Sequence, residues 1–505
     1  MRLRTLAVVV MTGLATAPVT VQAAPRSDAG AHRTSIPAAV SVDLFSPLLS
    51  RADPAVVPAK PFRPTRATGS EAATSHAGFA SLSAAQPTIP LLTQVSTFPM
   101  MNLDTQVAAL GVLQAVEPPD TMMAAGPTVL LETVNSNVSV WTKTGTRIAL
   151  ADLNKLPMPT GWTFSDPRVL FDALTGRFFF IGLAFALNHS SLVFLGVSKT
   201  SDPAGGFFLY TVAQTSNGQL HDQPKIGIND DKVVISWDEY CCGFFGVFRG
   251  AETFVFEKAT LLTGAVTPVF FFGPSPAQAS PVPAQSLTST TTAYVTYNHG
   301  NFTGVLTITG TPAQNNVVVA ETQLATPVTA TPPAAIQPGG TIETNDDRFL
   351  SSVWKDGVLW VSGSTGCTPP GSAVVRSCAR LVQVSTTGPA PSLLQALDVG
   401  AAGVDAYFPA VTLDAAGDLF VAITASSASV FASAAVVEIA AGAPPGSVSA
   451  SKVFQFGAQT YGGTRWGDYS AACVDPATGT VWVAAEYSAA GSNHNWGTAA
   501  AQFTG

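Results

Sequence analysis

The chain has 505 residues, of which 47% are hydrophobic and only 11% charged, and it contains 43 glycines and 37 prolines. This mixture is too apolar for a disordered chain and too rich in turn-forming residues for a helical protein. The net charge of −8 at pH 7 argues against nucleic acids and anionic membranes as partners.

The first 23 residues have the features of a secretory signal peptide. Arg2 and Arg4 precede an apolar run, and Val21 and Ala23 are placed for cleavage after Ala23. The alternative, a single transmembrane anchor, is disfavoured because the apolar run is short and rich in small residues. We therefore expect a secreted protein, extracellular or periplasmic, with no membrane attachment after cleavage.

Residues 24–104 are rich in Ala, Pro, Ser and Thr and show little periodicity. Such a composition is typical of a disordered spacer or a pro-segment. Ordered sequence is expected from about Thr105, so that residues 105–505 form one folded domain. Short runs of Val, Phe, Thr and Ile recur in this domain and predict β-strands throughout.

One pattern repeats seven times in the domain. A polar cluster is followed by a strand, a turn and a second strand, usually with two more strands, and the clusters lie 46 to 63 residues apart. This plan favours a seven-bladed β-propeller of four-stranded blades over a β-sandwich, which rarely repeats one four-strand unit so often. The clusters are centred on Asp120, Asp166, Asp222, Pro283, Asp346, Asp405 and Asp468.

Aspartate and glycine mark the first hairpin turn of several units. These residues supply the positive φ angles and local side-chain hydrogen bonds that tight turns need. The predicted turns are Asp172–Gly176, residues 355–357, Asp414–Gly417 and Asp475–Gly479.

The last unit is one strand short, because the 37 residues after Asp468 hold only about three strands. A propeller can take the missing strand from its N-terminal side, which removes an exposed sheet edge. The apolar run Val107–Val116 is the predicted closing strand.

Five cysteines indicate disulfides in an exported protein. Cys367 and Cys378 bracket a loop that a bridge would close. The adjacent Cys241 and Cys242 form a vicinal disulfide, or one of them pairs with Cys473. No cysteine spacing matches a zinc site.

The stretches "EPPDTMMAAGP", "SDPRVLFDALTGRFFF", "DQPKIGINDDKVVIS" and "RWGDYSAACVDPATGTVWVAAEY" resemble a group of secreted bacterial β-propeller proteins of unassigned activity, over residues 117–500. A looser resemblance is to sialidase-type glycosidases, which hold a carboxylate with three arginines and use a tyrosine nucleophile. That likeness would assign these roles to Arg168, Arg348 and Arg465, and to Tyr407 or Tyr469. The sialidase Asp-box pattern is absent.

Residues just before the innermost strands of a propeller converge at one mouth of its channel, although they are far apart in sequence. An aspartate there anchors the loop between blades, or supplies the hard oxygen ligands that suit calcium. We predict no metal motif and no cofactor beyond such a calcium ion. Candidate catalytic residues are His221, Asp222, Tyr407 and Tyr469, and candidate substrate-binding residues are Arg168, Lys225, Arg348, Arg465, Trp237 and Glu486.

These residue types suit a polar ligand. Arginine and lysine bind carboxylates, His221 beside Asp222 suits a general base, and Trp237 suits stacking on a sugar. We therefore predict a monomeric propeller that binds a glycan or other polar polymer at its central mouth, and cleaves it as a glycoside hydrolase or polysaccharide lyase if it is an enzyme. The alternative is a non-catalytic binding or protein-interaction module, in which each candidate group already has a partner within the fold.

Overall fold

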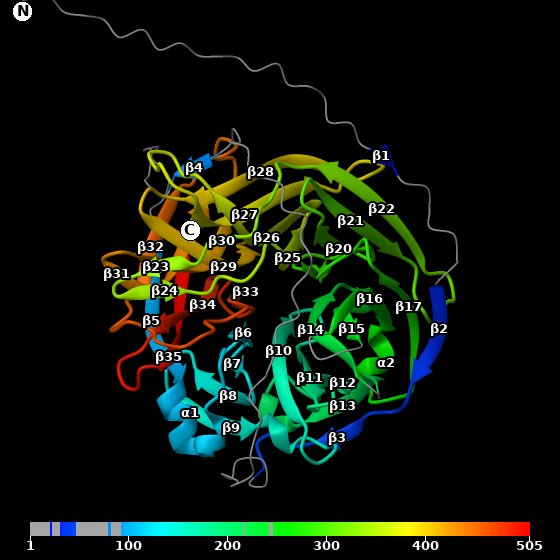
Figure 1. Ribbon diagram of the computed structural model, residues 1–505. Coiled ribbons are helices and arrows are strands. Elements are labelled where there is room, and N and C mark those ends of the chain that lie inside the picture. Colours follow the sequence, from blue (N-terminus) through cyan, green and yellow to red (C-terminus); the bar gives the residue numbers. More distant parts are fainter. Residues whose placement is uncertain (1–20, 23–30, 47–78, 82–91, 216–217, 242–245) are drawn as a thin grey trace, which may run out of the picture.

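The computed structural model describes residues 21–22, 31–46, 79–81, 92–215, 218–241 and 246–505. Seven antiparallel sheets follow one another around a ring in chain order, with the first strand of each sheet nearest the centre (Figure 1). This confirms the predicted seven-bladed β-propeller of four-stranded blades. The predicted signal peptide lies outside the described residues, apart from Val21 and Gln22.

The first three blades each consist of four consecutive strands. They are β6 (Met122–Ala125), β7 (Val129–Val134), β8 (Asn137–Thr142) and β9 (Arg147–Asp152) in blade 1; β10 (Thr163–Asp172), β11 (Arg177–Phe185), β12 (Ser191–Ser198) and β13 (Phe207–Gln214) in blade 2; and β14 (Gln219–Ile228), β15 (Lys232–Cys241), β16 (Val247–Glu257) and β17 (Thr267–Ser275) in blade 3.

Blades 4 to 7 follow the same order. They are β18 (Val282–Pro283), β20 (Ala293–Asn298), β21 (Phe302–Thr309) and β22 (Val318–Ala325) in blade 4; β25 (Phe349–Lys355), β26 (Val358–Cys367), β27 (Arg376–Ser385) and β28 (Ser392–Gly400) in blade 5; β29 (Val404–Leu413), β30 (Leu419–Ser427), β31 (Val430–Ile439) and β32 (Ala450–Gln455) in blade 6; and β33 (Ala471–Val474), β34 (Val481–Ser488), β35 (Trp496–Thr504) and β5 (Thr93–Asn102) in blade 7.

Short elements complete the fold. Strand β19 pairs with β25, and β23 and β24 form a separate hairpin. No helix in the described ranges is long and apolar enough to cross a membrane. These elements are β19 (Gln285–Ser286), β23 (Ala335–Gln337), β24 (Gly340–Ile342), the helices α1 (Leu103–Leu110) and α2 (Lys258–Leu261), and the 3-10 helices Val112–Gln114, Leu153–Lys155 and Pro203–Gly205.

Strand β5 closes the ring as the outermost strand of blade 7, where it pairs antiparallel with the C-terminal strand β35 (Figure 1). The prediction of closure by an N-terminal strand is therefore confirmed, but the predicted segment is wrong. Val107–Val116 falls instead in α1 and the 3-10 helix that follows it. Leu103 and Leu110 are the buried apolar residues of α1, and their spacing of seven suits one face of a helix.

The segment predicted to be a spacer contributes further strands. Strand β2 (Ala31–Ile36) pairs with β17 of blade 3, and β3 (Val40–Val42) pairs with β13 of blade 2. Two shorter strands, β1 (Val21–Gln22) and β4 (Phe79–Ser81), pair with β22 and β28. Because β2, β3 and β5 are hydrogen-bonded to blades, the predicted start of the folded domain at residue 105 is too late.

Each predicted hairpin turn is present in the structure. Gly176 donates its backbone N–H to the Asp172 carbonyl over 2.8 Å, and Gly479 does the same to Asp475 over 2.9 Å. In blade 5, Asp356 and Gly357 have φ angles of 48° and 84°, the conformation that a two-residue hairpin turn requires.

Apolar side chains fill the space between neighbouring blades. Between blades 2 and 3, for example, Phe179 and Ile181 pack with Ile226 and Ile235, and all four are buried. The core is therefore distributed around the ring, and the central channel is lined mainly by the inner strands. In blade 5, the predicted disulfide between Cys367 and Cys378 is present.

A two-residue bulge interrupts several inner strands near their start. In blades 2, 3 and 6 the register shifts at residues 166–167, 223–224 and 408–409, which are Asp-Pro, Gln-Pro and Phe-Pro. The first residue of each pair has a positive φ of 53°, 49° and 53°. Gln223, not Asp222, thus occupies the position of Asp166, and Phe408, not Asp405, occupies it in blade 6.

Removal of β5 should open the ring. We expect a chain that begins at residue 103 to lose about 5 kcal/mol or more of unfolding free energy, because the buried side chains of Met100 and Met101 are lost and the edge of β35 is exposed. A chain that begins at residue 91 lacks β2 and β3 but keeps every blade four-stranded, so it should lose much less. Urea unfolding and light scattering measure both, and equal losses would contradict the assignment of β5.

Candidate functional site

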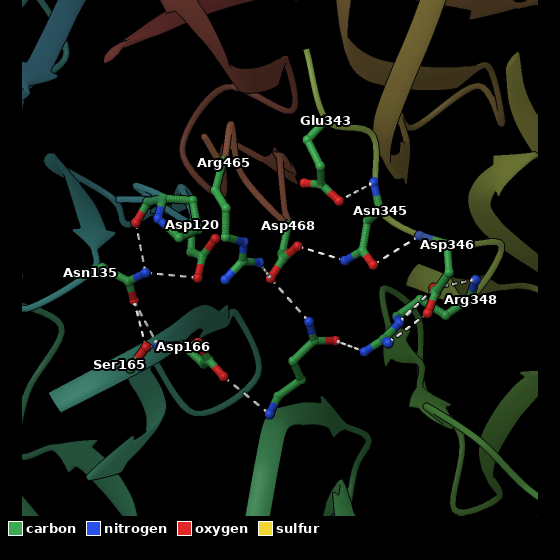
Figure 2. A network of polar contacts seen from close by, with 12 residues as sticks. Asp120, Asn135, Ser165, Asp166, Glu343, Asn345, Asp346, Arg348, Arg465 and Asp468 are labelled. Carbon is green, nitrogen blue, oxygen red and sulfur yellow. Dashed lines mark hydrogen bonds and ion pairs between the residues drawn. The ribbon is translucent and has the colours of Figure 1, made fainter. Parts of the chain in front are cut away.

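The channel has two ends that differ in chemistry. We call the end at which the inner strands begin the upper mouth, and the end at which their first hairpins turn the lower mouth. A hydrogen-bonded network of side chains spans the upper mouth (Figure 2). Its members are Asp120, Asn135, Ser165, Asp166, Gln223, Glu343, Asn345, Asp346, Arg348, Arg465 and Asp468.

Gln223 connects the two sides of this network. Its Nε2 donates to Asp468 Oδ2 over 3.0 Å, and its Oε1 accepts from Arg348 Nη1 over 2.6 Å. Its backbone N–H donates to Asp166 Oδ2 over 3.1 Å. One buried residue of blade 3 is thereby tied to blade 2 through its backbone and to blades 5 and 7 through its side chain.

The blade 5 part of the network is an ion pair held by an asparagine. Arg348 Nε and Nη2 donate to the two carboxylate oxygens of Asp346 over 2.7 and 2.6 Å. Asn345 Nδ2 donates to Asp468 Oδ1 over 2.6 Å, and Asn345 Oδ1 accepts from the Asp346 backbone N–H. Asn345 has a φ of 63°, a conformation that asparagine tolerates better than most residues.

Blades 1 and 2 meet at Asn135. Its Nδ2 donates to Asp120 Oδ2 over 2.8 Å, and its Oδ1 accepts from the Asp166 backbone N–H over 2.8 Å. On the blade 7 side, Arg465 Nη2 donates to Asp468 Oδ2 over 2.7 Å. The upper mouth is thus closed by groups that mostly satisfy one another.

Two buried cations lie outside these ion pairs. Arg168 Nη1 donates to the Leu350 carbonyl over 2.8 Å, and the guanidinium lies 4.0 Å from the ring centre of Tyr469. Lys225 Nζ reaches only the Gln223 carbonyl, at 3.3 Å. Neither forms an ion pair within the described part of the chain. Burial lowers the pKa of Lys225 to about 7, against the opposing effect of Asp238.

Burial also shifts the acids and phenols of the site. The pKa of Glu486 is raised well above its usual range, first by burial and then by the negative charges of Asp120 and Asp468. Glu486 packs directly beneath Gly467, where an added Cβ would lie 2.2 Å from its Oε2. The pKa of Tyr469 is raised by burial and by Asp166. Neutral forms of both groups are therefore favoured.

The structure places three predicted site residues in the packing between strands. Trp237 is fully buried and donates to Glu252, so its ring has no exposed face for a sugar. The ring of His221 contacts that of Trp237 at a tilt of 35°, with ring centres 4.8 Å apart, and burial lowers the pKa of His221 to about 4. Tyr407 is fully buried and donates to the Ser426 hydroxyl.

The remaining predicted residues surround the channel. Arg348 and Arg465 belong to the network, and Arg168, Lys225, Tyr469 and Glu486 are buried close to it. Asp222 is buried and contributes to the fields at Lys225 and Tyr240. Asp405, predicted to lie at the same mouth, instead accepts from the backbone N–H groups of Ile336 and Ser377.

Sequence reasoning missed the amides of the network: Asn135, Gln223 and Asn345. The sequence could have predicted Gln223, because the proline that follows it repeats the Asp-Pro of blade 2 and so aligns Gln223 with Asp166. No sequence pattern marks Asn135, since it follows β7 and reaches the mouth only through the packing of blades 1 and 2. Over the described ranges, no group of three or more His, Cys, Asp or Glu side chains is arranged to hold a metal ion.

Comparisons with known proteins are distant. No family model matches the sequence, and no curated protein is recognisably similar to it. Among solved structures, an ACO/RPE65 chimera has a TM-score of 0.38 at 13% identity, and the match covers 68% of this chain and 73% of the chimera. The Hadza microbial sialidase Hz136 has a TM-score of 0.37 at 13% identity, with 61% and 63% covered. The exo-beta-1,3-galactanase 1,3Gal43A from Clostridium thermocellum has a TM-score of 0.30 at 10% identity, with 74% and 84% covered.

Gln223→Ala should destabilise the ring strongly. It leaves Arg348 and Asp468 each without one buried hydrogen-bond partner, which typically costs about 2 to 4 kcal/mol for charged groups. Gln395→Ala is the matched control, because Gln395 also makes two hydrogen bonds but lies half-buried on β28. Urea unfolding compares the free energies of unfolding of the two variants, and similar losses in both would contradict a special role for Gln223.

Lys225→Met should change the pH dependence of stability. The folded protein binds fewer protons than the unfolded chain between about pH 7 and 10.5, so wild-type stability rises with pH in this window. The variant lacks this rise. We expect its free energy of unfolding to exceed that of wild type by about 1 to 3 kcal/mol at pH 7, with a smaller difference at pH 9. Lys452→Met, exposed on β32, should show no such trend.

Proposed function

We propose that the protein is a carbohydrate-binding propeller that holds a neutral glycan at its upper mouth. The observation that carries this proposal is the half-exposed edge of the network, formed by Glu343, Asn345, Asp346 and Arg465. Sugar hydroxyls donate and accept hydrogen bonds, and this edge offers carboxylate, amide and guanidinium partners side by side.

The charges of the network favour a neutral sugar over an acidic one. Arg348 and Arg465, predicted to clamp a carboxylate, already pair with Asp346 and Asp468. The other acidic members of the network outnumber its cations, so a sugar carboxylate would have to displace an aspartate in a negative field. The geometry therefore supports the glycan-binding part of the prediction and shifts the preferred ligand away from acidic sugars.

Cleavage of the glycan is the second candidate function, and Glu486 favours it. A carboxylic acid kept neutral by burial, beside the carboxyl groups of Asp120 and Asp468, resembles the arrangement by which glycosidases separate an acid from a base. The rival reading, a non-catalytic module, is supported by the internal partners of Arg348 and Arg465. Analysis of bound polysaccharides for new reducing ends distinguishes the two.

Purified protein should bind a neutral polysaccharide in a screen of neutral and acidic polymers. Asn345→Gly should weaken that binding at least tenfold, about 1.4 kcal/mol, because it removes an amide from the mouth while glycine keeps the positive φ. Asn315→Gly is the control, since Asn315 has a φ of 56° in an exposed turn between β21 and β22. Binding unchanged in Asn345→Gly, or confined to acidic polymers, would contradict the proposal.

A further inference from the structure

A small cavity lies within the channel, below the network. It measures about 40 Å³, and we call it the inner chamber. The inner strands of several blades contribute its walls, many of them small residues such as Ala124, Ala410 and Ala471. Its polar lining comes from Arg168, Gln285, Ser351, Ser352 and Ser470. Gln285 donates to the Phe171 carbonyl, and the Ser351 hydroxyl accepts from the Val411 backbone N–H.

The other three polar residues, Arg168, Ser352 and Ser470, have atoms without partners in the portion of the chain that the structure describes. These atoms are Nε and Nη2 of Arg168, Oγ of Ser352 and Oγ of Ser470. The three residues are only 5%, 7% and 4% exposed. Buried polar atoms are rarely left unsatisfied in folded proteins, so a ligand or water is expected to complete them.

The chemistry of these atoms points to an anion. A guanidinium can only donate, it keeps its charge, and each serine hydroxyl can also donate. In its protonated form, Lys225, which likewise lacks an ion pair in the described ranges, adds positive charge near Arg168. One water occupies about 10 to 15 Å³ in this measure of volume, so the inner chamber admits a group of roughly three heavy atoms. A carboxylate has that size, and guanidinium groups bind carboxylates through paired N–H donors.

A larger cavity of about 450 Å³ opens at the lower mouth. It shares Phe171, Gln285 and Cys473 with the inner chamber, so the two spaces lie against each other. Most of its wall is apolar, and this volume falls within the range of small-molecule sites. The apolar residues are Phe171, Leu174, Ile228, Leu287, Leu413, Val474 and Pro476.

The acidic residues of the lower cavity already have partners. Asp172 pairs with Lys258 at 2.8 Å, and Asp230 accepts from the Ser289 hydroxyl at 2.6 Å. Asp414 accepts from the backbone N–H groups of Gly417 and Asp418. These contacts hold the hairpin turns, and they leave the apolar wall as the main surface offered to a ligand.

We propose that the channel binds a monocarboxylate with an apolar tail, which enters from the lower mouth. The tail fills the lower cavity, and the carboxylate reaches the inner chamber, where Arg168, Ser352 and Ser470 donate to it. This site is separate from the glycan site proposed at the upper mouth, and none of its three donors belongs to the network.

Calorimetric titration with a series of straight-chain carboxylates tests the proposal. Affinity should rise about threefold to fourfold per methylene from butanoate to octanoate, as apolar burial predicts. Sodium chloride and acetate should bind at least a hundredfold more weakly than octanoate. If chloride binds as tightly as octanoate, the inner chamber is an inorganic anion site and the proposed ligand is wrong.

Arg168→Gln should weaken octanoate binding at least tenfold and leave polysaccharide binding unchanged. Arg147→Gln, on the outermost strand of blade 1, is the matched control and should bind octanoate normally. Equal octanoate affinity in both variants would overturn the proposal.

Two measurements remain decisive if Arg168→Gln does not fold. Leu174 is 68% exposed at the lower mouth, so Leu174→Asp should fold and should weaken octanoate binding by adding a negative charge to the entrance. In the wild type, octanoate should slow the reaction of Cys473 with methyl methanethiosulfonate, because this free thiol lines both cavities. If octanoate binds without protecting Cys473, or binds Leu174→Asp as tightly as wild type, then it binds outside the two cavities and the proposal is wrong.

Discussion

The hydrogen bonds of Gln223 across the upper mouth form only when the ring of blades is closed, because their partners come from other blades. The bulge at residues 223–224 turns this side chain into the channel, where water is largely excluded. A buried amide must then bond to other protein groups, and its partners come from blades 5 and 7, while the backbone N–H of the same residue bonds to blade 2. The network therefore has its full set of partners only when β5 has closed blade 7, so local strand geometry and global closure support each other.

Buried arginines have different partners at the upper mouth and in the inner chamber. At the upper mouth, Arg348 and Arg465 pair with aspartates, and Gln223 accepts a further hydrogen bond from Arg348, which offsets much of the cost of desolvation. Below it, the contacts of Arg168 among the described residues are a carbonyl and the face of Tyr469. A stacked arginine is partly compensated, but its remaining N–H donors are not. This difference is why we assign a small anion to the inner chamber and an uncharged glycan to the mouth.

Local chemistry made several features predictable from the sequence. The turn at Asp172–Gly176 and the bridge between Cys367 and Cys378 depend on residues close together in the chain. Ring closure was predictable from the short last blade, but β5 was not, because Pro99 and a composition rich in Thr and Ser hide its alternation within an apparent spacer. Its proline is tolerated because β5 is an outermost strand. Strands β2 and β3 find their partners more than 160 residues away and carry no strong pattern of their own.

The candidate site was harder to predict, because identical short patterns lead to different contacts. Asp166 and Arg168 are two residues apart, as are Asp346 and Arg348, yet only the second pair forms an ion pair among the described residues. In blade 2 the aspartate itself takes the positive φ and the bulge separates it from the arginine. In blade 5 the positive φ falls on Asn345 instead, and the carboxylate of Asp346 accepts a hydrogen bond from Arg348 Nη2. The residue that takes the positive φ near the start of the inner strand thus decides whether the arginine pairs with the aspartate or keeps donors for a ligand. This outcome depends on backbone conformation rather than on residue type.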